Sequence, residues 1–510
     1  MKNAATAVPA KPGSSEEREA FRRLQARLPE QFRRIFPDPK APRTVLIVPS
    51  LSLDQEVMSR ITGVAHYEER FLCLLLLLRW PRTRVIYVTS TPIADSIIDY
   101  YLHLLPDVPT RHARGRLTLL SCNDTAPRPL TAKILDQPRL LEQLDEAIED
   151  ASTAHMTCFN VTALERSLAV RLGIPIYGCD PELEYLGSKS DARKLFKSVG
   201  VVVPHGFEDL GDVTSVADAL TQLKAQNPGM KRAVVKLNEG FSGEGNALLT
   251  FEGAPEKSGL DAWIRTKLPT LAFEARGMTW EAYAAKIAEM GAIVEAYVEG
   301  RDKRSPSAQY RVDPLGQVET ISTHDQIMGG KSAQIFLGCR FPADEGYRLE
   351  IQAEGLKVAE ALRERGVLGR FGVDFISVRE GDGWRHYAIE VNLRKGGTTH
   401  PFLMLQFLTD GTYDLATGLY HTPTGQPRFY YASDNLESPS YRGLTPENLI
   451  DIAVLNDLHF HGATQQGVVF HLLGALCEFG KLGVVCVADT LDHARALYER
   501  TISTLDHRAG

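Results

Sequence analysis

Two apolar segments joined by a short glycine-rich turn are the feature that most strongly constrains the fold of this chain. Residues 372–375 (Gly-Val-Asp-Phe) and 388–392 (Ala-Ile-Glu-Val-Asn) flank residues 381–383 (Gly-Asp-Gly), a pattern that predicts an antiparallel hairpin. Because successive strand residues face opposite sides, Glu390 and Asn392 face the same side. The hairpin therefore presents several oxygen-bearing side chains together.

Asp374, Glu390 and Asn392 offer two carboxylates and an amide oxygen. A Mg²⁺ ion that bridges a triphosphate uses such oxygen ligands and leaves positions for water and phosphate. An amphipathic strand with an acidic outer face shows the same alternation. The hairpin alone leaves both interpretations open.

A second glycine-rich segment lies upstream. Residues 233–237 and 246–249 are apolar runs that flank a loop with three glycines, and Lys236 stands at the root of this loop. Glycine amides can close onto phosphate oxygens, and Lys236 adds a fixed positive charge. The segment matches neither a Walker A loop nor a dinucleotide fingerprint. A flexible turn is the other interpretation.

Two further segments extend the pattern. Residues 292–300 predict a strand and linker that either hold a purine through backbone groups or form an ordinary edge strand. Residues 188–200 predict a helix, because Ser188 and Asp191 have capping-box spacing and Gly200 suits the position after the last turn.

The order of these segments resembles the ATP-grasp family. It runs from Lys189 through Lys236 and the glycine loop to Glu-x-Tyr-Val-x-Gly at 295–300, then to Asp374 and Glu-x-Asn-x-Arg at 390–394. The resemblance covers about residues 185–405. It implies two α+β subdomains that clamp ATP, a carboxylate converted to an acyl phosphate, and an amine that attacks it. Residues 323–330, 337–344 and 393–401 resemble the pheganomycin-type peptide ligase subgroup.

The resemblance implies a role for each matching residue. The phosphates would contact Lys189, Lys236, Gly240, Ser242, Gly243 and Gly245. The adenine would contact Glu295, Tyr297 and Val298, and the ribose would contact Asp302 or Glu299. Magnesium, or manganese as the alternative ion, would contact Asp374, Glu390 and Asn392.

The cations expected around the transferred phosphoryl group include one departure from the family. Arg394 would face the acyl phosphate or the substrate carboxylate. Many relatives carry an arginine two positions before the metal aspartate, where this chain has Gly372. The candidates to replace it are Arg340, Lys331 and Arg370.

His324 and His400 lie in polar, glycine-containing segments. They are candidates to orient the amine or take its proton, against the alternative of loop histidines without a role. Residues 324–340 predict a long loop, which is either a lid that excludes water or a surface excursion.

Composition limits the class of protein. A length of 510 residues suggests about three domains. The net charge of −7 comes without a basic block, so we expect no nucleic-acid partner. Seven cysteines without a Cys-x-x-Cys pair argue against a disulfide framework and a zinc site and favour a cytoplasmic protein. The apolar run 71–78 is far shorter than the ~20 residues of a membrane span and predicts a buried helix.

We expect an α/β and α+β multidomain protein. Residues 1–42 would be a disordered segment and a charged helix, 43–184 an open α/β sheet domain, 185–405 the ATP-grasp domain and 406–510 a small, subgroup-specific α/β domain. Residues 421–446 read as an irregular passage, and the last domain would serve packing or homodimer formation. The candidate ligand-binding residues at the strand ends of the first sheet are Ser50, Ser90, Thr91 and Asn160. Plain strand-end turns are the alternative interpretation of these four residues.

The sequence thus predicts an ATP-dependent carboxylate–amine ligase that releases ADP and phosphate and acts on small molecules or peptides. The alternatives are an ATP-grasp enzyme with a non-amine acceptor, a small-molecule kinase, and a nucleotide-binding scaffold without turnover. The retained lysines and acidic residues argue against the scaffold.

Overall fold

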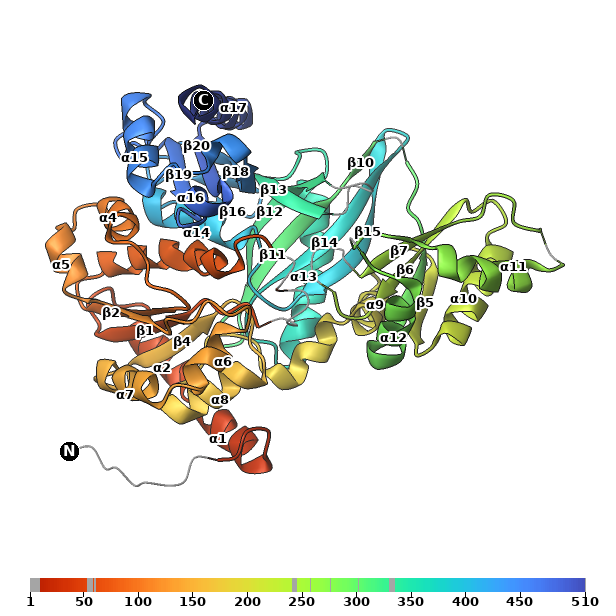
Figure 1. The fold of residues 1–510 in the computed structure, drawn as a ribbon, viewed down its shortest axis with the longest axis horizontal. Helices are drawn as coiled ribbons and strands as arrows, with labels where there is room; N and C mark the ends of the chain where they lie inside the picture. Colours follow the sequence, from red (N-terminus) through yellow and green to blue (C-terminus); the bar gives the residue numbers. More distant parts are fainter. Residues whose placement is uncertain are drawn as a thin grey trace.

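The computed structural model describes residues 10–52, 58, 61–240, 245–256, 258–275, 277–300, 302–329 and 335–509. Within these ranges the strands form sheets of four, nine, five and two strands. Figure 1 shows the large sheet in the middle, the N-terminal sheet at lower left, the five-stranded unit at right and the C-terminal helices at upper left.

The N-terminal sheet is parallel, with the order β3-β2-β1-β4. Its central strand β1 is an apolar run buried along its whole length, as expected for a parallel sheet covered on both faces. The open sheet predicted for this part of the chain is confirmed. The strands are β1 (Arg43–Val48), β2 (Thr83–Thr89), β3 (Leu117–Ser121) and β4 (Ala154–Cys158).

The predicted buried, leucine-rich helix is the 3₁₀ helix η1 (Val64–Arg79). The one charged helix expected within residues 1–42 is instead two helices, α1 and α2, and Pro29 lies at the start of the second, a position that suits proline. The helices of this part are α1 (Ser15–Gln25), α2 (Leu28–Ile35), α4 (Asp95–His103), α5 (Thr110–Arg114), α6 (Leu130–Leu135), α7 (Pro138–Ala147), α8 (Ala163–Leu172) and η2 (Pro181–Gly187).

The five-stranded antiparallel sheet has the order β5-β9-β6-β7-β8. The predicted strand–loop–strand unit is confirmed, with Lys236 opposite Asn246. The edge-strand alternative for residues 292–296 is wrong, because β9 lies between β5 and β6. The strands are β5 (Gly206–Leu210), β6 (Arg232–Leu237), β7 (Asn246–Thr250), β8 (Ala272–Phe273) and β9 (Ala292–Ala296).

Helices cover this small sheet and lead into it. The predicted helix α9 (Lys189–Ser198) is confirmed, since Ser188 Oγ accepts from the Asp191 backbone N–H at 3.2 Å and Gly200 has φ +72°. The other helices are α10 (Val213–Gln226), α11 (Leu260–Lys267), η3 (Leu268–Thr270) and α12 (Trp280–Met290).

The nine-stranded sheet has the order β10-β14-β11-β12-β13-β18-β20-β19, with β15 paired to β14. The predicted hairpin is confirmed, because β14 and β15 are antiparallel around Gly381. The long loop expected over 324–340 is wrong for the described residues: β12 continues to Gly329 and β13 begins at Ile335. These elements are β10 (Lys303–Arg304), β11 (Pro306–Val312), β12 (Val318–Gly329), β13 (Ile335–Phe341), α13 (Arg348–Glu364), β14 (Gly369–Glu380) and β15 (Gly383–Asn392).

The C-terminal strands extend the same sheet, because β18 pairs with both β13 and β20. The irregular passage expected over 421–446 is therefore wrong: its aromatic residues 429–431 begin a nine-residue strand. The domain boundary expected at residue 405 stays a prediction, and the chain that follows it returns to this sheet. The elements are α14 (Thr399–Thr409), β16 (Thr412–Asp414), β17 (Leu419–His421), β18 (Phe429–Glu437), η4 (Pro439–Tyr441), α15 (Pro446–Leu455), β19 (Gly467–His471), α16 (Ala475–Phe479), β20 (Lys481–Ala488) and α17 (Leu491–Ala509).

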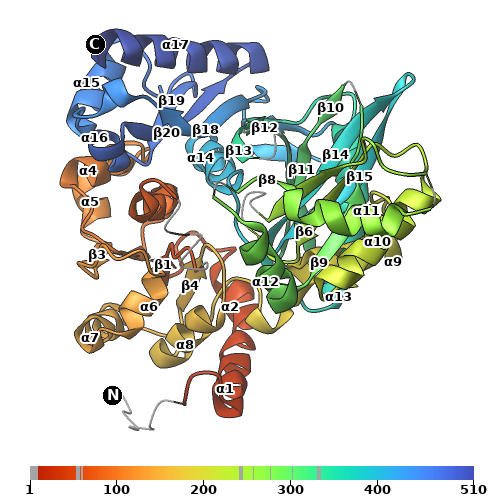
Figure 2. The same cartoon turned by 45° about the vertical axis from the view of Figure 1, so that its right-hand side comes forward.

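One hydrophobic core joins the two ends of the chain. It includes leucines of η1 from the N-terminal part and valines of β19 and β20 from the C-terminal part. Figure 2 shows α15 and α16 beside α4, in agreement with the contacts between α4 and α15. None of the described helices combines the length and apolarity that crossing a bilayer requires.

Candidate active site

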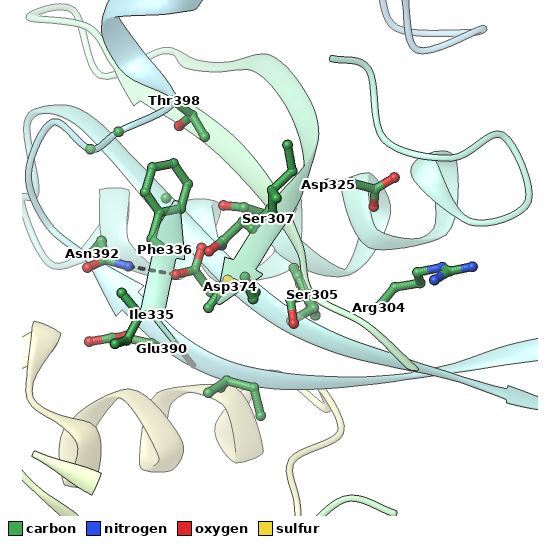
Figure 3. Close-up of a pocket in the computed structure, with 18 of the residues that line it drawn as sticks. Arg304, Ser305, Ser307, Asp325, Ile335, Phe336, Asp374, Glu390, Asn392 and Thr398 are labelled. Atoms are coloured by element: carbon green, nitrogen blue, oxygen red, sulfur yellow. Dashed lines mark hydrogen bonds between the residues drawn. The ribbon is translucent and has the colours of Figure 1, made fainter. Parts of the chain in front are cut away.

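The β14–β15 hairpin brings the three predicted metal ligands together. Asp374 and Glu390 are partners in the register, and Asn392 Nδ2 donates to Asp374 Oδ2 at 2.9 Å. Figure 3 draws the three side chains in the wall of one pocket, with Asn392 directed at Asp374. The arrangement follows from strand geometry, since positions 390 and 392 share a face.

The electrostatics of this group favour a cation. Burial and the neighbouring Glu390 raise the pKa of Asp374 to about 6, while hydrogen bonding from Ser307 opposes the shift. Burial also acts to raise the pKa of Glu390, but Lys189 and Arg394 outweigh it and lower this pKa. Two carboxylates held beside each other repel, and a divalent ion between them would relieve that repulsion.

The donor set fits Mg²⁺ in its chemistry, with one adjustment. Mg²⁺ prefers carboxylate, amide and water oxygens. Asn392 turns its Nδ2 toward Asp374, and its Oδ1 accepts from Arg394. If Asn392 is to offer its oxygen to a metal, its side-chain amide must turn over. The assignment of these three residues as ligands stays a prediction.

Lys189 meets the hairpin from helix α9. Its Nζ lies 3.3 Å from Glu390 Oε1, and its backbone N–H donates to the Asn238 carbonyl at 3.1 Å. The side chain is buried. Lys189 therefore belongs to the same charged group as the predicted metal ligands, at the end of the glycine loop.

Lys236 is paired with a glutamate that the sequence assigned to the adenine contact. Glu295, 2 % exposed, accepts from Lys236 Nζ at 2.5 Å and also from Arg193. Burial acts to raise the pKa of Glu295, but the two cations outweigh it and the pKa is lowered. The Glu295 carboxylate thus fixes Lys236 at the cavity wall, and the two cations occupy this carboxylate.

The predicted adenine contact at Tyr297 and Val298 is braced by cations. The Tyr297 ring lies between Arg232 Cζ, 3.9 Å from its centroid, and Lys303 Nζ, 4.1 Å from it. Lys303 Nζ also donates to the Tyr297 hydroxyl at 2.7 Å. Tyr297, Val298 and Lys303 all line the larger cavity.

Neither candidate for the ribose carboxylate lines the described cavities. Glu299 accepts from Arg232 at 2.5 and 3.0 Å, and Asp302 pairs with Arg304 at 3.0 Å. Both acids are engaged with neighbouring arginines. A ribose contact from either one would require the pair to open.

Part of the predicted phosphate loop lies outside the described residues, namely Ser242 and Gly243, and the same holds for Lys331. Gly240 and Gly245 flank the loop closely. A methyl group on Gly240 would lie 3.5 Å from the Gly245 nitrogen and 4.0 Å from Lys189 Nζ. The two ends of the loop therefore meet beside the lysine.

The structure explains why position 372 is a glycine in this chain. A Cβ at this position would lie 2.5 Å from Gln309 Nε2, so the glutamine of β11 fills the space that a side chain here would need. Of the described candidates for a replacement cation, Arg340 lines the cavity and donates to Asp325 at 2.9 and 3.1 Å. Arg370 lines neither described cavity and donates to Gln406 at 3.4 Å.

The alternative of loop histidines is wrong for both His324 and His400. His324 is in β12 and contacts the Tyr430 hydroxyl at 2.6 Å, and burial lowers its pKa to about 3. His400 is in α14 beside Asp434 and His471, and burial lowers its pKa to about 4. Neither side chain lines a described cavity, and their catalytic roles stay predictions.

Two described cavities meet at the hairpin. The larger, about 1230 Å³, extends from Lys236 and the Tyr297 segment to the C-terminal strands. The smaller, about 390 Å³, lies beside the glycine loop and Asn160. Glu390, Asn392 and Arg394 line both. A reaction at these residues is therefore open to ligands from two sides.

Sequence reasoning missed the far wall of the larger cavity. Arg70 and Lys481 line it from segments 411 positions apart, and both are buried, at 6 % and 5 % exposed. Lys481 Nζ donates to the Tyr67 hydroxyl at 3.0 Å, and Arg70 contacts Asp434 at 3.4 Å. The one signal available was a lysine that opens the apolar run of β20.

The strand-end candidates of the N-terminal sheet differ in whether they line a cavity. Asn160 lines the smaller cavity and donates to the Ser52 carbonyl at 3.0 Å. Ser50 hydrogen-bonds Ser52, and Ser90 donates to Glu68 at 2.6 Å. The Thr91 carbonyl accepts from Thr89 at 2.7 Å. Local hydrogen bonding accounts for the last three.

Family comparisons agree with this site. The ATP-grasp family described as IQCH-like matches residues 181–253 and 260–416, and the family described as PGM1 C-terminal domain matches residues 448–501. The first match contains Lys189, Lys236, the hairpin and Arg394. The part of the chain that contains the site thus matches an ATP-grasp family model.

Individual relatives narrow the class. The L-propargylglycine–L-glutamate ligase of Streptantibioticus cattleyicolor is 28 % identical over 470 residues, 91 % of this chain and 94 % of that protein. IQ motif-containing protein H of Danio rerio is 21 % identical over 515 residues, 91 % of this chain but 48 % of that longer protein. Over nearly its whole length the chain is thus similar to a ligase.

A solved structure shows the same fold at low identity. The biotin carboxylase domain of the Hydrogenobacter thermophilus 2-oxoglutarate carboxylase, solved with MgADP, ADP and bicarbonate, has a TM-score of 0.56, with 12 % identity over 91 % of this chain and 90 % of that one. The predicted fold class is confirmed.

Proposed function

We propose that this protein is an ATP-dependent carboxylate–amine ligase that forms an amide or peptide bond through an acyl phosphate and releases ADP and phosphate. The observation that carries the proposal is that Glu390, Asn392 and Arg394 line both cavities, with Asp374 beside them in the larger cavity and Lys189 paired to Glu390. A substrate carboxylate and the triphosphate of ATP, bound together there, would face both the predicted metal ligands and cationic side chains.

The nucleotide would lie along the larger cavity. Its purine would contact the backbone at residues 295–298, and its phosphates would extend past Lys236 toward Lys189 and the hairpin. Mg²⁺ held by Asp374, Glu390 and Asn392 would neutralise charge on the phosphates. The cavity of about 1230 Å³ is larger than a typical site for one small molecule, which leaves room for a second substrate.

The protein's own cations would then act on the reacting groups. A substrate carboxylate oxygen attacks the γ-phosphorus, the bond to the β-phosphate oxygen breaks, and ADP leaves. Lys189 and Arg394 stabilise the charge that spreads over the transferred group. An amine next attacks the acyl carbon, and phosphate leaves with the former carboxylate oxygen while the amine loses a proton.

The substrate end combines cations with acids such as Asp325 and Asp434. Arg70, Arg340 and Lys481 line the larger cavity beyond the hairpin, and these side chains suit a carboxylate-bearing substrate such as an amino acid or a short peptide. The relative's name includes two amino acids, L-propargylglycine and L-glutamate. We propose amino acids as the first substrate class to test.

The test measures ADP release with Mg-ATP against amino acids and short peptides, offered singly and in pairs, with mass spectrometry of the products. We expect ADP release that depends on a pair, and a product whose mass equals the two substrates minus water. ADP release with one substrate and a phosphorylated product would show a kinase instead. ATP binding without turnover across the panel would count against ligation of amino acids.

A further inference from the structure

Three buried polar side chains converge behind the wall of the larger cavity, which one of them, Asp434, lines, and they lie outside the proposed nucleotide site. His400 lies in α14, Asp434 in β18 and His471 at the end of β19. The histidines are 1 % and 0 % exposed and Asp434 is 5 % exposed. The strand register shifts between Ser433 and Leu436, which places Asp434 in an irregular part of β18.

The contacts form a triangle. Asp434 Oδ1 lies 3.0 Å from His400 Nε2 and 2.8 Å from His471 Nε2, and the two Nε2 atoms are 3.1 Å apart. Among the described residues this is the one set of three His, Cys, Asp or Glu side chains whose ligand atoms lie within 4.8 Å of one another. The three atoms come from three separate elements.

Protons do not satisfy all three contacts at once. A neutral imidazole carries one N–H, either at Nε2 or at Nδ1. If both Nε2 atoms carry protons, both N–H groups can donate to Asp434 Oδ1, but the 3.1 Å contact between the nitrogens is then a contact between two donors. If one is bare, the other must direct its single N–H at either the nitrogen or the carboxylate. A central cation would accept a lone pair from each atom.

We propose that His400 Nε2, His471 Nε2 and Asp434 Oδ1 bind one divalent transition-metal ion, with zinc as the chemical fit. Zinc binds imidazole nitrogen and carboxylate oxygen at about 2.0–2.2 Å, which places tetrahedral ligand atoms ~3.3 Å apart. The observed separations require small outward shifts. The cysteine pattern predicts no zinc site, but it does not bear on a site of histidine and aspartate.

The surroundings give the ion a role. Asp434 lines the larger cavity, so a water molecule or a substrate group can complete the coordination from that side. The second carboxylate oxygen of Asp434 lies 3.4 Å from Arg70 Nη1. An ion on Oδ1 would hold Asp434 still and thereby orient Arg70. It would also tie α14, which follows Arg394, to the C-terminal strands.

The test uses the full-length protein without an affinity tag, purified from zinc-supplemented medium, dialysed against a chelating resin and kept free of ATP. We expect a single zinc ion per chain by mass spectrometry of the elements. Replacement with Co²⁺ should give visible d–d absorption, and X-ray absorption should show two imidazole ligands. Because no nucleotide is present, the result does not depend on the ligase assignment.

The variants His471→Ala and Asp434→Asn should lose the metal, with circular dichroism to confirm folding. His155→Asn is the matched control, because His155 is also buried but lies in β4, and it should retain the metal. Background zinc with no cobalt spectrum in the wild-type protein would overturn the proposal. Unchanged zinc in both folded variants would also overturn it. If neither variant folds, the X-ray absorption spectrum of the wild-type protein tests the proposal. Two imidazole ligands support it, and fewer than two overturn it.

Discussion

The nucleotide half and the substrate end of the larger cavity are built in different ways. The nucleotide half uses residues close in sequence: a hairpin supplies Asp374 and Glu390, and one small sheet supplies Lys236 and Glu295. The substrate end joins Arg70 of η1 to Asp434 and Lys481 of the C-terminal strands. Local motifs thus encode phosphate chemistry, and tertiary packing encodes the substrate wall. Substitutions should separate the two.

The largest effect should come from Glu390→Gln in the nucleotide half. The change removes one carboxylate from the predicted metal site and the partner of Lys189, so kcat should fall about 10²- to 10³-fold, as when a single charge-stabilising group is lost. Steady-state ADP release measures this. Glu380→Gln, an exposed position on the same hairpin, is the control and should leave kcat unchanged. Equal turnover in both variants would remove Glu390 from the site.

Lys236→Ala should act next, and on ATP affinity. Hydrogen bonds to charged groups contribute about 1.5–3 kcal/mol, so the Kd for ATP should rise ~30-fold. Calorimetry in the absence of other substrates measures the change. Lys231→Ala, one residue before β6 and exposed, should keep the wild-type Kd. An unaltered Kd in the first variant would place the phosphates elsewhere.

Lys481→Met should give a smaller effect at the other end of the cavity. The ammonium donates to Tyr67 and lines the substrate wall, so its loss should raise the KM for the carboxylate substrate about tenfold. The Kd for ATP should not change. Lys357→Met, exposed on α13, serves as the control. A parallel loss of ATP affinity would show that the two ends are not separable.

Gly372→Ala should have the smallest effect and act on stability. Its Cβ would meet Gln309 Nε2, the far end of a flexible side chain, at 2.5 Å, so the glutamine must move away from Ser307, and the free energy of unfolding should fall by about 1 kcal/mol, the low end of the cost of overpacking. Urea unfolding measures the loss, and Gln309→Ala in the same chain should restore most of it. A destabilisation that the second change does not relieve would mean that Gln309 is not the obstacle.

The sequence predicted elements with strong local signals. The hairpin, helix α9 and the strand–loop–strand unit each have turn or capping residues at fixed spacing, and the structure contains all three. The grouping of Lys189 with Glu390 also follows from the order of these motifs, although the ligand roles remain predictions.

The errors share a physical cause. His324 and His400 stand in polar, glycine-containing stretches, yet tertiary packing buries them against Tyr430 and Asp434. The polar residues of β18 did not indicate a strand, but pairing with a neighbouring strand on each side stabilises it. Such burial depends on partners far along the chain, which periodicity within one segment does not indicate.

The central claim is that the substrate carboxylate becomes an acyl phosphate. The most direct measurement supplies a substrate with an ¹⁸O-labelled carboxylate, Mg-ATP and the amine, and follows the label by mass spectrometry of the released phosphate. Phosphate that carries one substrate oxygen, together with ADP and a condensed product, is the result we predict. Condensed product with unlabelled phosphate, or with AMP and pyrophosphate, would contradict the account.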